Sequence, residues 1–303
     1  MIIYRYLIFL LYVLNHPFAK GHKLRLFTKM IWWKINRRFF KLPCIVELVH
    51  NIKIICYPND SLYSTLIVYL ILPEYGEMKF LLEILNKDDN FIDIGANMGI
   101  YSLLASSKIE KGRIFSFEPS PKILPQLYEN IALNNKKNCI RVIEKAVSGK
   151  EGYINFDVSD SPDYNHIVYP KEAEVSFAGD SVLRVGTITL DKFISGKNIK
   201  NIKLIKIDVE GAELLVLKGL QKTLEEKKVA ALIVEISKWT ISRFGTTVEE
   251  IVYFLRKYGF DIYMFDKNFN LIELSSGKNQ GWNIIAIHKS RNDIIKRFNR
   301  NTK

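Results

Sequence analysis

The seven residues from Asp93 to Gly99 have the composition of a ligand-binding turn between a strand and a helix. They read Asp-Ile-Gly-Ala-Asn-Met-Gly, and Gly95 and Gly99 allow a tight turn with a close backbone approach to a ligand. Free backbone N–H groups at the helix start would favour an anion. The pattern matches neither GxGxxG nor GxxxxGK[ST]. It therefore favours a small anionic group, such as an amino-acid carboxylate, over a pyrophosphate, with a purely structural turn as the alternative.

Glu118 ends the next apolar strand, 25 residues after Asp93. In doubly wound sheets an acid at this place accepts hydrogen bonds from both hydroxyls of a ribose. A solvated acid at a strand end is the alternative. The glycine turn and this acid at this spacing together favour nucleoside binding.

Four further side chains are candidates for accepting a substrate proton. Asp208, Glu210 and Glu235 follow or end buried strands, where parallel sheets bind ligands. His166 lies in a polar loop and titrates near neutral pH. The alternatives are an N-cap for Asp208, a favourable charge at a helix start for Glu210, a strand-end polar group for Glu235 and an exposed surface residue for His166. Because Asp208 and Glu210 are two residues apart, they need not point the same way.

Metal binding is only weakly indicated. The three acids could form an oxygen site for Mg²⁺, but the chain has no HxH, HxxxH or cysteine cluster. We expect no obligatory metal. Cys44, Cys56 and Cys139 are too few and too scattered for a disulfide framework or a structural zinc site, which predicts reduced thiols.

These candidates fall where strands end in an alternating strand–helix chain. Such alternation predicts a mostly parallel sheet covered on both faces. We expect strands at 91–95, 113–119, 138–143, 202–209, 229–236, 260–265 and 283–288, helices at 99–109, 121–135, 211–220 and 247–258, further strands at 153–158 and 187–193, a strand pair within 45–56 turning near His50 and Asn51, and two short helices within 61–86. The long segment 157–186 is expected to help select the acceptor.

Several motifs in order resemble those of FkbM-type S-adenosylmethionine-dependent methyltransferases. They read DIGANMGIYS, FEPSP, NIALN, AVSGKEG, TLDKF, IKIDVEGAELLVLKG and VEIS, and they run from about Phe91 to Ser237, around half of the chain, with a weaker tail to residue 288. The resemblance implies a class I methyltransferase fold. This is a Rossmann-like, doubly wound, mostly parallel sheet of seven strands. It also implies S-adenosylmethionine as methyl donor and usually a hydroxyl oxygen as acceptor.

Carried over by position, the resemblance assigns site residues. The segment 93–99 should hold the methionine part of the donor, Glu118 the ribose and Ala146 the adenine, while Asp208 and Glu210 should border the transfer site. The implied cofactor residues are Asp93, Gly95, Ala96, Asn97, Gly99, Tyr101, Ser102, Glu118, Pro119 and Ala146.

The chemistry agrees with this assignment. Methyl transfer from a sulfonium is a direct displacement, which needs alignment, exclusion of water and removal of the acceptor proton. That proton requires a base within hydrogen-bond reach, and the four candidates are those named above.

The N-terminal 44 residues are hydrophobic and basic. Residues 2–14 are apolar or tyrosine except for Arg5, too short a run to span a bilayer, and no A-x-A cleavage pattern follows. Residues 23–41 interleave Lys, Arg, Trp and Phe without any acid, as suits a lipid headgroup region. We expect residues 1–41 to form an interfacial or monotopic anchor on an anionic membrane. A helix packed on the catalytic body and a nucleic-acid contact are the alternatives.

The net charge of +12 is concentrated at the two ends. Residues 1–45 carry +9 and residues 289–303 carry +5, which leaves −2 for the rest. A hydrophobic fraction of 48% with 25% charged residues excludes a mainly disordered chain. We expect four parts: the segment 1–44, a strand pair with helices at 45–88, the methyltransferase domain at 89–288 and a basic tail at 289–303.

The resemblance, together with the expected membrane anchor, implies an O-methyltransferase for a saccharide, glycolipid or similar small acceptor. Because its donor is made inside cells, we expect it on the cytoplasmic face of the membrane. A nucleic-acid methyltransferase is the alternative, although Val-Glu-Gly after Asp208 differs from the Pro-Pro-aromatic run typical of base-amino methyltransferases. A nicotinamide oxidoreductase lacks its glycine pattern. A non-catalytic anchored binding module is the third reading, and the intact motif acids argue against it.

Overall fold

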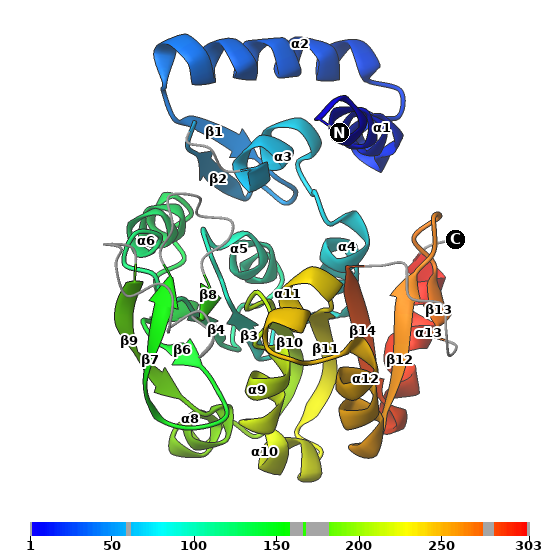
Figure 1. The fold of residues 1–303 in the computed structure, drawn as a ribbon. Helices are drawn as coiled ribbons and strands as arrows, with labels where there is room; N and C mark the ends of the chain where they lie inside the picture. Colours follow the sequence, from blue (N-terminus) through cyan, green and yellow to red (C-terminus); the bar gives the residue numbers. More distant parts are fainter. Residues whose placement is uncertain (1, 59–61, 158–165, 168–181, 275–281, 302–303) are drawn as a thin grey trace. The chain divides into compact units, whose positions relative to one another are not determined.

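The structure is a computed structural model that describes residues 2–58, 62–157, 166–167, 182–274 and 282–301 (Figure 1). The chain forms two compact units, Met1–Tyr75 and Gly76–Lys303, and each is described by itself. The domain boundaries expected from the sequence stay a prediction.

The unit Met1–Tyr75 combines helices with a two-stranded antiparallel ribbon. The predicted strand pair is confirmed, and His50 and Asn51 at its turn both have positive φ. The helices of the described residues are all too short or too polar to cross a bilayer. The elements are α1 (Ile2–Asn15), the 3₁₀ turn η1 (Pro17–Ala19), α2 (Lys23–Ile35), the π-helical turn η2 (Asn36–Phe40), β1 (Cys44–Glu47), β2 (Lys53–Cys56) and α3 (Leu62–Leu70).

The unit Gly76–Lys303 is centred on an eight-stranded sheet of order β13-β12-β14-β11-β10-β3-β4-β5. The five strands from β11 to β5 pair in parallel, β14 runs antiparallel to both β11 and β12, and β13 is antiparallel to β12. The bounds are β3 (Phe91–Ile94), β4 (Ile114–Phe117), β5 (Ile140–Ile143), β10 (Ile202–Ile207), β11 (Val229–Glu235), β12 (Phe260–Phe265), β13 (Leu271–Glu273) and β14 (Asn283–His288).

The strand order reverses beside β3, the first of these strands in the chain. From β3 the chain adds β4 and β5 toward one edge and β10 and β11 toward the other. Every residue of β3, β4 and β10 is buried, as expected for parallel strands covered on both faces. The carboxyl ends of β3 and β10 therefore flank the switch point, where open α/β sheets bind their ligands.

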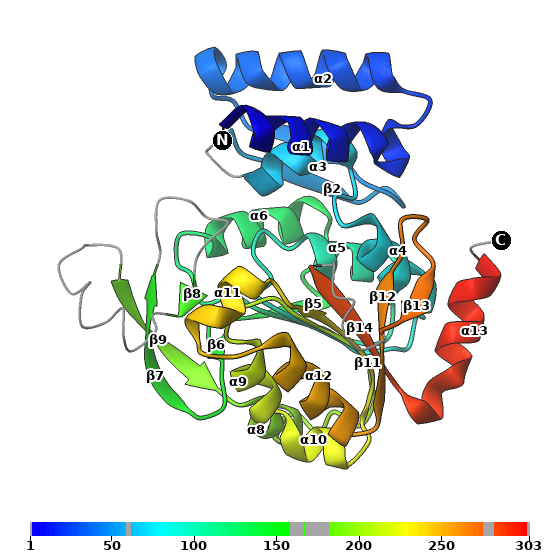
Figure 2. The ribbon, with the colours of Figure 1, turned by 45° about the vertical axis from the view of Figure 1, so that its right-hand side comes forward.

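Helices cover both faces of this sheet (Figure 2). The helices α4, α5 and α6 lie on one face and α8, α9, α10 and α12 on the other. A capping box starts α12, because Thr247 and Glu250 each accept a hydrogen bond from the other's backbone N–H. The bounds are α4 (Tyr75–Ile84), α5 (Ile100–Ser106), α6 (Leu124–Leu133), α8 (Leu190–Gly196), α9 (Glu213–Lys218), α10 (Gln221–Glu225), α11 (Lys238–Arg243), α12 (Val248–Lys257), η4 (Lys289–Arg291) and α13 (Asn292–Asn301).

A second, four-stranded sheet lies in the connection between β5 and α8. Its order is β6-β9-β7-β8, with bounds β6 (Ala146–Val147), β7 (Gly152–Asp157), β8 (His166–Ile167) and β9 (Val182–Ile188). The strand expected at 187–193 is wrong beyond Ile188, because the Thr189 side chain caps α8 by accepting a hydrogen bond from Lys192 N at 3.3 Å. The expected acceptor-selecting segment 157–186 lies largely outside the described residues.

The predicted mostly parallel α/β fold is confirmed, with two differences in detail. The sheet has eight described strands rather than seven, because β13 adds to the edge at β12. The expected helix 211–220 is shorter in the structure, because α9 covers only Glu213–Lys218 and a separate helix, α10, begins at Gln221. At this break a Cβ on Gly219 would lie 2.2 Å from the carbonyl oxygen of Ser148, so the backbones pack directly on each other there.

Candidate active site

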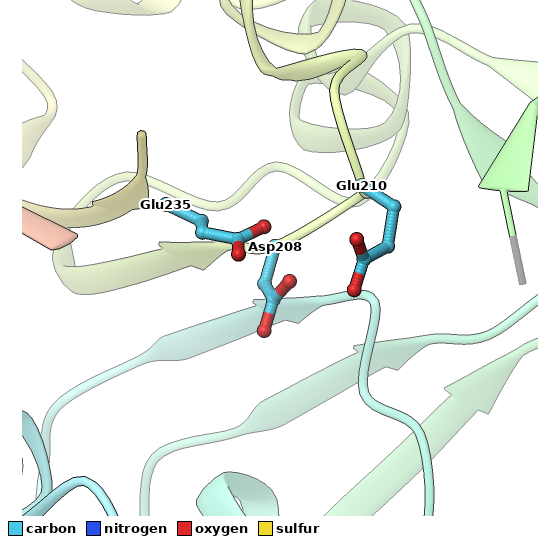
Figure 3. A group of neighbouring side chains, drawn as sticks. All are labelled: Asp208, Glu210 and Glu235. Carbon is cyan, nitrogen blue, oxygen red and sulfur yellow. The ribbon is translucent and has the colours of Figure 1, made fainter. Parts of the chain in front are cut away.

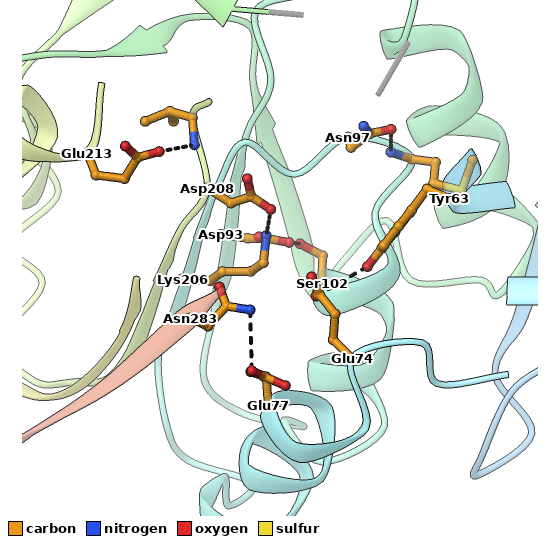
Figure 4. Close-up of polar contacts among 12 residues, drawn as sticks. Tyr63, Glu74, Glu77, Asp93, Asn97, Ser102, Lys206, Asp208, Glu213 and Asn283 are labelled. Atoms are coloured by element: carbon orange, nitrogen blue, oxygen red, sulfur yellow. Dashed lines mark hydrogen bonds and ion pairs between the residues drawn. The ribbon is translucent and has the colours of Figure 1, made fainter. Parts of the chain in front are cut away.

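Asp93 is buried on β3 below the turn that leads to α5 (Figure 4). Its Oδ2 accepts a hydrogen bond from Ser102 Oγ at 2.6 Å, and Ser102 Oγ lies 2.6 Å from Ser116 Oγ. The other oxygen, Asp93 Oδ1, is buried without a hydrogen-bond partner among the described residues. Burial raises the pKa of Asp93, while the charge of Lys206 and the bond from Ser102 oppose the rise. Asp93 thus has one buried acceptor oxygen at the switch point that no described residue satisfies.

The backbone N–H groups of residues 95–99 all donate hydrogen bonds within the protein. The expectation that they are free to bind an anion is therefore wrong, because the end of β4, Glu118 and the turn itself take up these donors. The acceptors are Phe117 O for Gly95 and Ala96, Glu118 Oε2 for Asn97, Asn97 Oδ1 for Met98 and Ala96 O for Gly99.

Gly95 brings two strand-end loops into contact. Its φ is +76°, and a Cβ at this position would lie 1.8 Å from the carbonyl oxygen of Asp208. No other residue fits there without moving the loop that follows β10. The close backbone approach expected of this glycine is thus made to Asp208, which places the turn after β3 directly beside the acids after β10.

Glu118 is fixed by two backbone donors. Its Oε2 accepts from Asn97 N and its Oε1 from Ser120 N, both at 2.9 Å. Burial raises the pKa of this carboxyl to about 7, against the effect of both hydrogen bonds. Each carboxylate oxygen has a second lone pair, so Glu118 presents two oriented acceptor positions at the end of β4.

Asp208, Glu210 and Glu235 form a cluster of carboxyl groups (Figure 3). One oxygen from each lies within 4.8 Å of the other two. Asp208 and Glu235 meet because β10 and β11 are parallel neighbours, with Ile207 paired to Val234. Three such oxygens could also serve as ligands for a divalent cation. The expectation of no obligatory metal stays a prediction.

A strained turn directs Glu210 into this cluster. Glu210 has a φ of +55°, a left-handed conformation that is uncommon outside glycine. Glu213 stabilises the turn, because its buried Oε1 accepts hydrogen bonds from Val209 N at 3.1 Å and Gly211 N at 3.0 Å. The alternative role of Asp208 as a helix cap is wrong, since α9 starts after Ala212.

Lys206 supplies the buried positive charge beside the cluster. Its Nζ donates to Asp208 Oδ2 at 2.7 Å (Figure 4). The same Nζ lies 4.6 Å from the centre of the Tyr101 ring. The Lys206 side chain is 6% exposed, compared with 30% for Asp208. Asp208 therefore carries its negative charge next to a largely desolvated cation.

We expect Lys206→Met to lower the free energy of unfolding by roughly 2–4 kcal/mol, because it leaves the Asp208 charge unpaired in a partly buried site. Urea unfolding at neutral pH measures the change. The double variant Lys206→Met with Asp208→Asn should recover most of the loss. Equal stability of the two variants would show that the ion pair does not matter.

Burial and the charge of Asp208 raise the pKa of both Glu210 and Glu235. For Glu210 the pKa rises to about 8, although Arg243 and Lys206 oppose the rise. For Glu235 the pKa rises further, and its Oε2 is buried without a hydrogen-bond partner among the described residues. At neutral pH Glu235 is therefore protonated and Glu210 is close to titrating.

We expect Glu235→Gln to be more stable than the wild type at alkaline pH. The unfolded wild type loses the Glu235 proton above its ordinary pKa of 4.5, whereas the folded protein keeps it, so stability falls as the pH rises toward the raised pKa. Glutamine resembles the protonated acid and does not titrate. The gain should reach roughly 1–2 kcal/mol at about pH 8 and disappear near pH 5, as measured by Tm. A gain independent of pH would contradict the raised pKa.

The other site residues predicted from the sequence lie on several different elements. Tyr101 and Ser102 are buried on α5, and Ala146 is buried on β6. Pro119 follows Glu118 after β4 and is half-buried. His166 lies on β8, paired with Asp157, and its side chain lies outside the described part of the chain.

The roles of Lys206 and Glu213, and the hydrogen bond between Asn283 and Glu77, were not predicted from the sequence. Lys206 and Glu213 lie inside the motif IKIDVEGAE, so their place in that motif was an available signal. Asn283 pairs with Glu235 between β14 and β11, and its Nδ2 donates to Glu77 Oε1 at 3.3 Å (Figure 4). Nothing in the local sequence marks Asn283 or Glu77.

Comparison with known protein families identifies the family of this chain. The model of the "Methyltransferase FkbM domain" family matches residues 93–262, which include the turn after β3, Glu118 and the acid cluster. The chain belongs to this family. It is a class I methyltransferase, and S-adenosylmethionine is its methyl donor.

Three curated relatives in this family are similar over about half of the chain. Methyltransferase sdnD of Sordaria araneosa is 28% identical over 195 residues, which cover 56% of this chain and 73% of the relative. Hexuronic acid methyltransferase AglP of Haloferax volcanii is 30% identical over 163 residues, 54% of this chain and 62% of AglP. The 2-O-methyltransferase NoeI of Sinorhizobium fredii is 30% identical over 159 residues, 49% of this chain and 64% of NoeI. The chain thus spans less than two thirds of AglP and NoeI.

The residues at the switch point fit the donor chemically. Glu118 presents two oriented acceptors suited to the two hydroxyls of a ribose. The unpartnered Asp93 Oδ1 suits an ammonium or another N–H-bearing group.

Proposed function

We propose that this enzyme methylates a hydroxyl oxygen of a sugar-containing acceptor. The observation that carries the proposal is the group of Asp208, Glu210 and Glu235, which lies beside the switch point and contains a carboxyl that titrates near pH 8. Such a group suits removal of a hydroxyl proton. The names of two relatives, a hexuronic acid methyltransferase and a 2-O-methyltransferase, support an oxygen acceptor on a sugar.

The donor is held, in this proposal, by residues at the ends of β3 and β4. Glu118 accepts hydrogen bonds from the ribose hydroxyls, and Asp93 Oδ1 accepts one from the amino group of the methionine part. The segment 93–99 with Tyr101 and Ser102 shapes the methionine side, while Pro119 and Ala146 border the nucleoside. When bound, S-adenosylmethionine supplies an electrophilic methyl group whose transfer leaves the bonding electron pair on sulfur.

Glu210 is the proposed general base. The acceptor oxygen forms the new bond to carbon with its own lone pair, and Glu210 takes the hydroxyl proton. A carboxylate whose pKa is about 8 holds that proton more tightly than an ordinary one, and it is matched to a near-neutral working pH. Glu210 returns the proton to water after product release.

The neighbouring acids tune this base. Burial raises the pKa of Glu210, and Asp208, fixed by Lys206, supplies a negative charge that raises it further. Glu235 keeps its proton and can donate a hydrogen bond to an acceptor oxygen. His166 remains a candidate base of this proposal because an imidazole is a good proton acceptor near neutral pH.

We also propose that the enzyme meets its acceptor at an anionic membrane surface on the cytoplasmic side, through residues 1–41. The absence of any acid in this segment and its nine basic residues support the proposal. Segment 157–186 is proposed to contribute to acceptor choice.

The test is an acceptor screen with methyl-labelled donor. Purified protein is incubated with free hexuronic acids, neutral glycans, lipid-linked sugars and short RNA and DNA strands. We expect label in a sugar fraction, as an alkali-stable methyl ether identified by mass spectrometry. Label found only in nucleic acid would overturn the sugar assignment, and label found in a carboxyl ester would overturn the hydroxyl assignment.

A further inference from the structure

Helix α2 has apolar side chains on two opposite faces. Leu26, Met30 and Trp33 are spaced by four and three residues and are buried within the unit Met1–Tyr75. Trp33 Nε1 donates to Thr65 Oγ1 of α3 at 3.0 Å, so this face is packed against its own unit. The apolar residues of the other face therefore need a separate explanation.

The outer face of α2 is exposed. Leu24, Phe27, Ile31 and Ile35 recur at intervals of three, four and four residues, which places them on one side of the helix. Leu24 is 78% exposed and Phe27 59% exposed. A continuous exposed apolar stripe marks an interaction surface. With the exposed Trp32 and with Phe39 of the following turn η2, the residues of this outer face are Leu24, Phe27, Ile31, Trp32, Ile35 and Phe39.

Cations border this outer face on both sides. The helical period places Arg25 along one border and Lys34 along the other, and both residues are exposed. Arg38, also exposed, adds a further cation in the adjoining turn η2. No acid occurs before Glu47. The surface thus has an apolar, aromatic centre between two positively charged margins.

We infer that the outer face of α2 lies in the headgroup region of an anionic lipid bilayer, with the helix axis along the membrane surface. Aromatic rings and aliphatic side chains enter the acyl boundary, while flanking lysine and arginine side chains contact lipid phosphates. This inference rests on the membrane part of the proposed function and names the surface that makes the contact.

The charge pattern favours lipid over other occupants. A second copy pairing through the same face would bring together two cationic segments without a single acid. A nucleic acid would be met by cations at the centre of the contact, whereas here large aliphatic side chains occupy the centre. Phosphate-bearing lipid matches both the apolar centre and the charged margins.

The experiment measures partition of the full chain onto phosphatidylcholine vesicles with and without phosphatidylglycerol. We expect the wild type to bind the anionic vesicles. The variant Phe27→Ser, Ile31→Ser, Phe39→Ser should bind at least about tenfold more weakly. A matched control, Tyr253→Ser with Ile272→Ser, removes exposed apolar side chains from the other unit and should bind as the wild type does.

A second variant tests the charged margins. Arg25→Gln with Lys34→Gln and Arg38→Gln should lose most of the preference for anionic over neutral vesicles, because fewer cations meet the lipid phosphates. Salt should weaken wild-type binding in the same direction.

Several outcomes would overturn the inference. Unchanged vesicle binding by the serine variant would do so. A lipid-free wild-type dimer that the serine variant converts to a monomer would identify a second copy as the occupant, and loss of oligonucleotide binding instead of vesicle binding would identify nucleic acid.

Titration with S-adenosylhomocysteine separates the membrane inference from the proposed methyl-transfer chemistry. Normal donor binding without vesicle binding refutes the membrane surface alone, and vesicle binding without transfer to any acceptor refutes the proposed chemistry alone.

Discussion

Replacement of Glu210 by glutamine is expected to slow methyl transfer by at least about a hundredfold at saturating donor and acceptor. Glutamine keeps the length and shape of the side chain but cannot accept a proton. Binding of S-adenosylhomocysteine should change by less than about threefold, because Glu210 acts on the acceptor and not on the donor. Single-turnover rates with labelled donor, together with calorimetric titration, measure both quantities.

The pH dependence gives this prediction a second readout. Glu210 must be unprotonated to act as the base, so the wild-type rate should rise with pH and level off above about 8, the raised pKa of this carboxyl. The Glu210→Gln variant should lack this rise over the same range. Rates measured between about pH 6 and 9.5 decide the point.

Glu249→Gln is the matched control, because Glu249 is an exposed acid in the first turn of α12, and its rate should stay near that of the wild type. A Glu210→Gln rate within about threefold of the wild type would place the base elsewhere, with Asp208 and His166 as the next candidates. Complete loss of wild-type transfer on metal chelation would also contradict the role of Glu210 as the base, because the carboxylates would then act as ligands of a cation.

The positions of the acids at strand ends could be predicted from the sequence, because the carboxyl ends of parallel strands all lie at one edge of the sheet. Apolar runs bounded by acids were enough to place Asp93, Glu118 and Asp208 at the carboxyl ends of neighbouring strands, as the sheet order confirms. The proximity of Asp208 and Glu235 follows from the same argument, since their strands are parallel neighbours.

The direction of Glu210 could not be predicted in this way. It depends on a left-handed backbone at Glu210, which Glu213 stabilises through two backbone hydrogen bonds. Residue spacing carries no information on such a turn. The state of three N–H groups in the turn at 95–99 was equally hidden. Gly95 and Ala96 donate to Phe117 O and Asn97 donates to Glu118, more than twenty residues further along the chain.

Long-range packing also limited the prediction of elements. The pattern of 211–220 is helical throughout, yet α9 ends at Lys218, next to Gly219, which packs on the backbone of Ser148. In α2, residue types alone show that aromatic and basic residues alternate. Only the packing of Trp33 on Thr65 shows which apolar residues face inward and which are left exposed.

Glu118→Ala is expected to weaken binding of S-adenosylhomocysteine by at least about a hundredfold, since it removes the two charge-assisted hydrogen bonds to ribose that we propose. Glu118→Gln keeps one acceptor oxygen and should show an intermediate loss. Glu110→Ala is the control. Glu110 is exposed and lies in the loop before β4, at the opposite end of the strand from Glu118, so this variant should bind as the wild type does. Calorimetric titration measures all three variants.

The pH dependence of donor binding separates a ribose contact from a purely structural role of Glu118. Burial raises the pKa of this carboxyl to about 7, so the fraction of carboxylate, the better acceptor, increases as the pH rises through that value. Wild-type affinity should therefore increase between about pH 6 and 8, and the Glu118→Ala variant should show no such increase. If Glu118 only held the backbone at Asn97 and Ser120 in place, the Glu118→Ala variant would bind the donor product more weakly, but the pH dependence of its affinity would match that of the wild type. A profile that persists in the variant would assign the titration to another group and remove Glu118 from the ribose site.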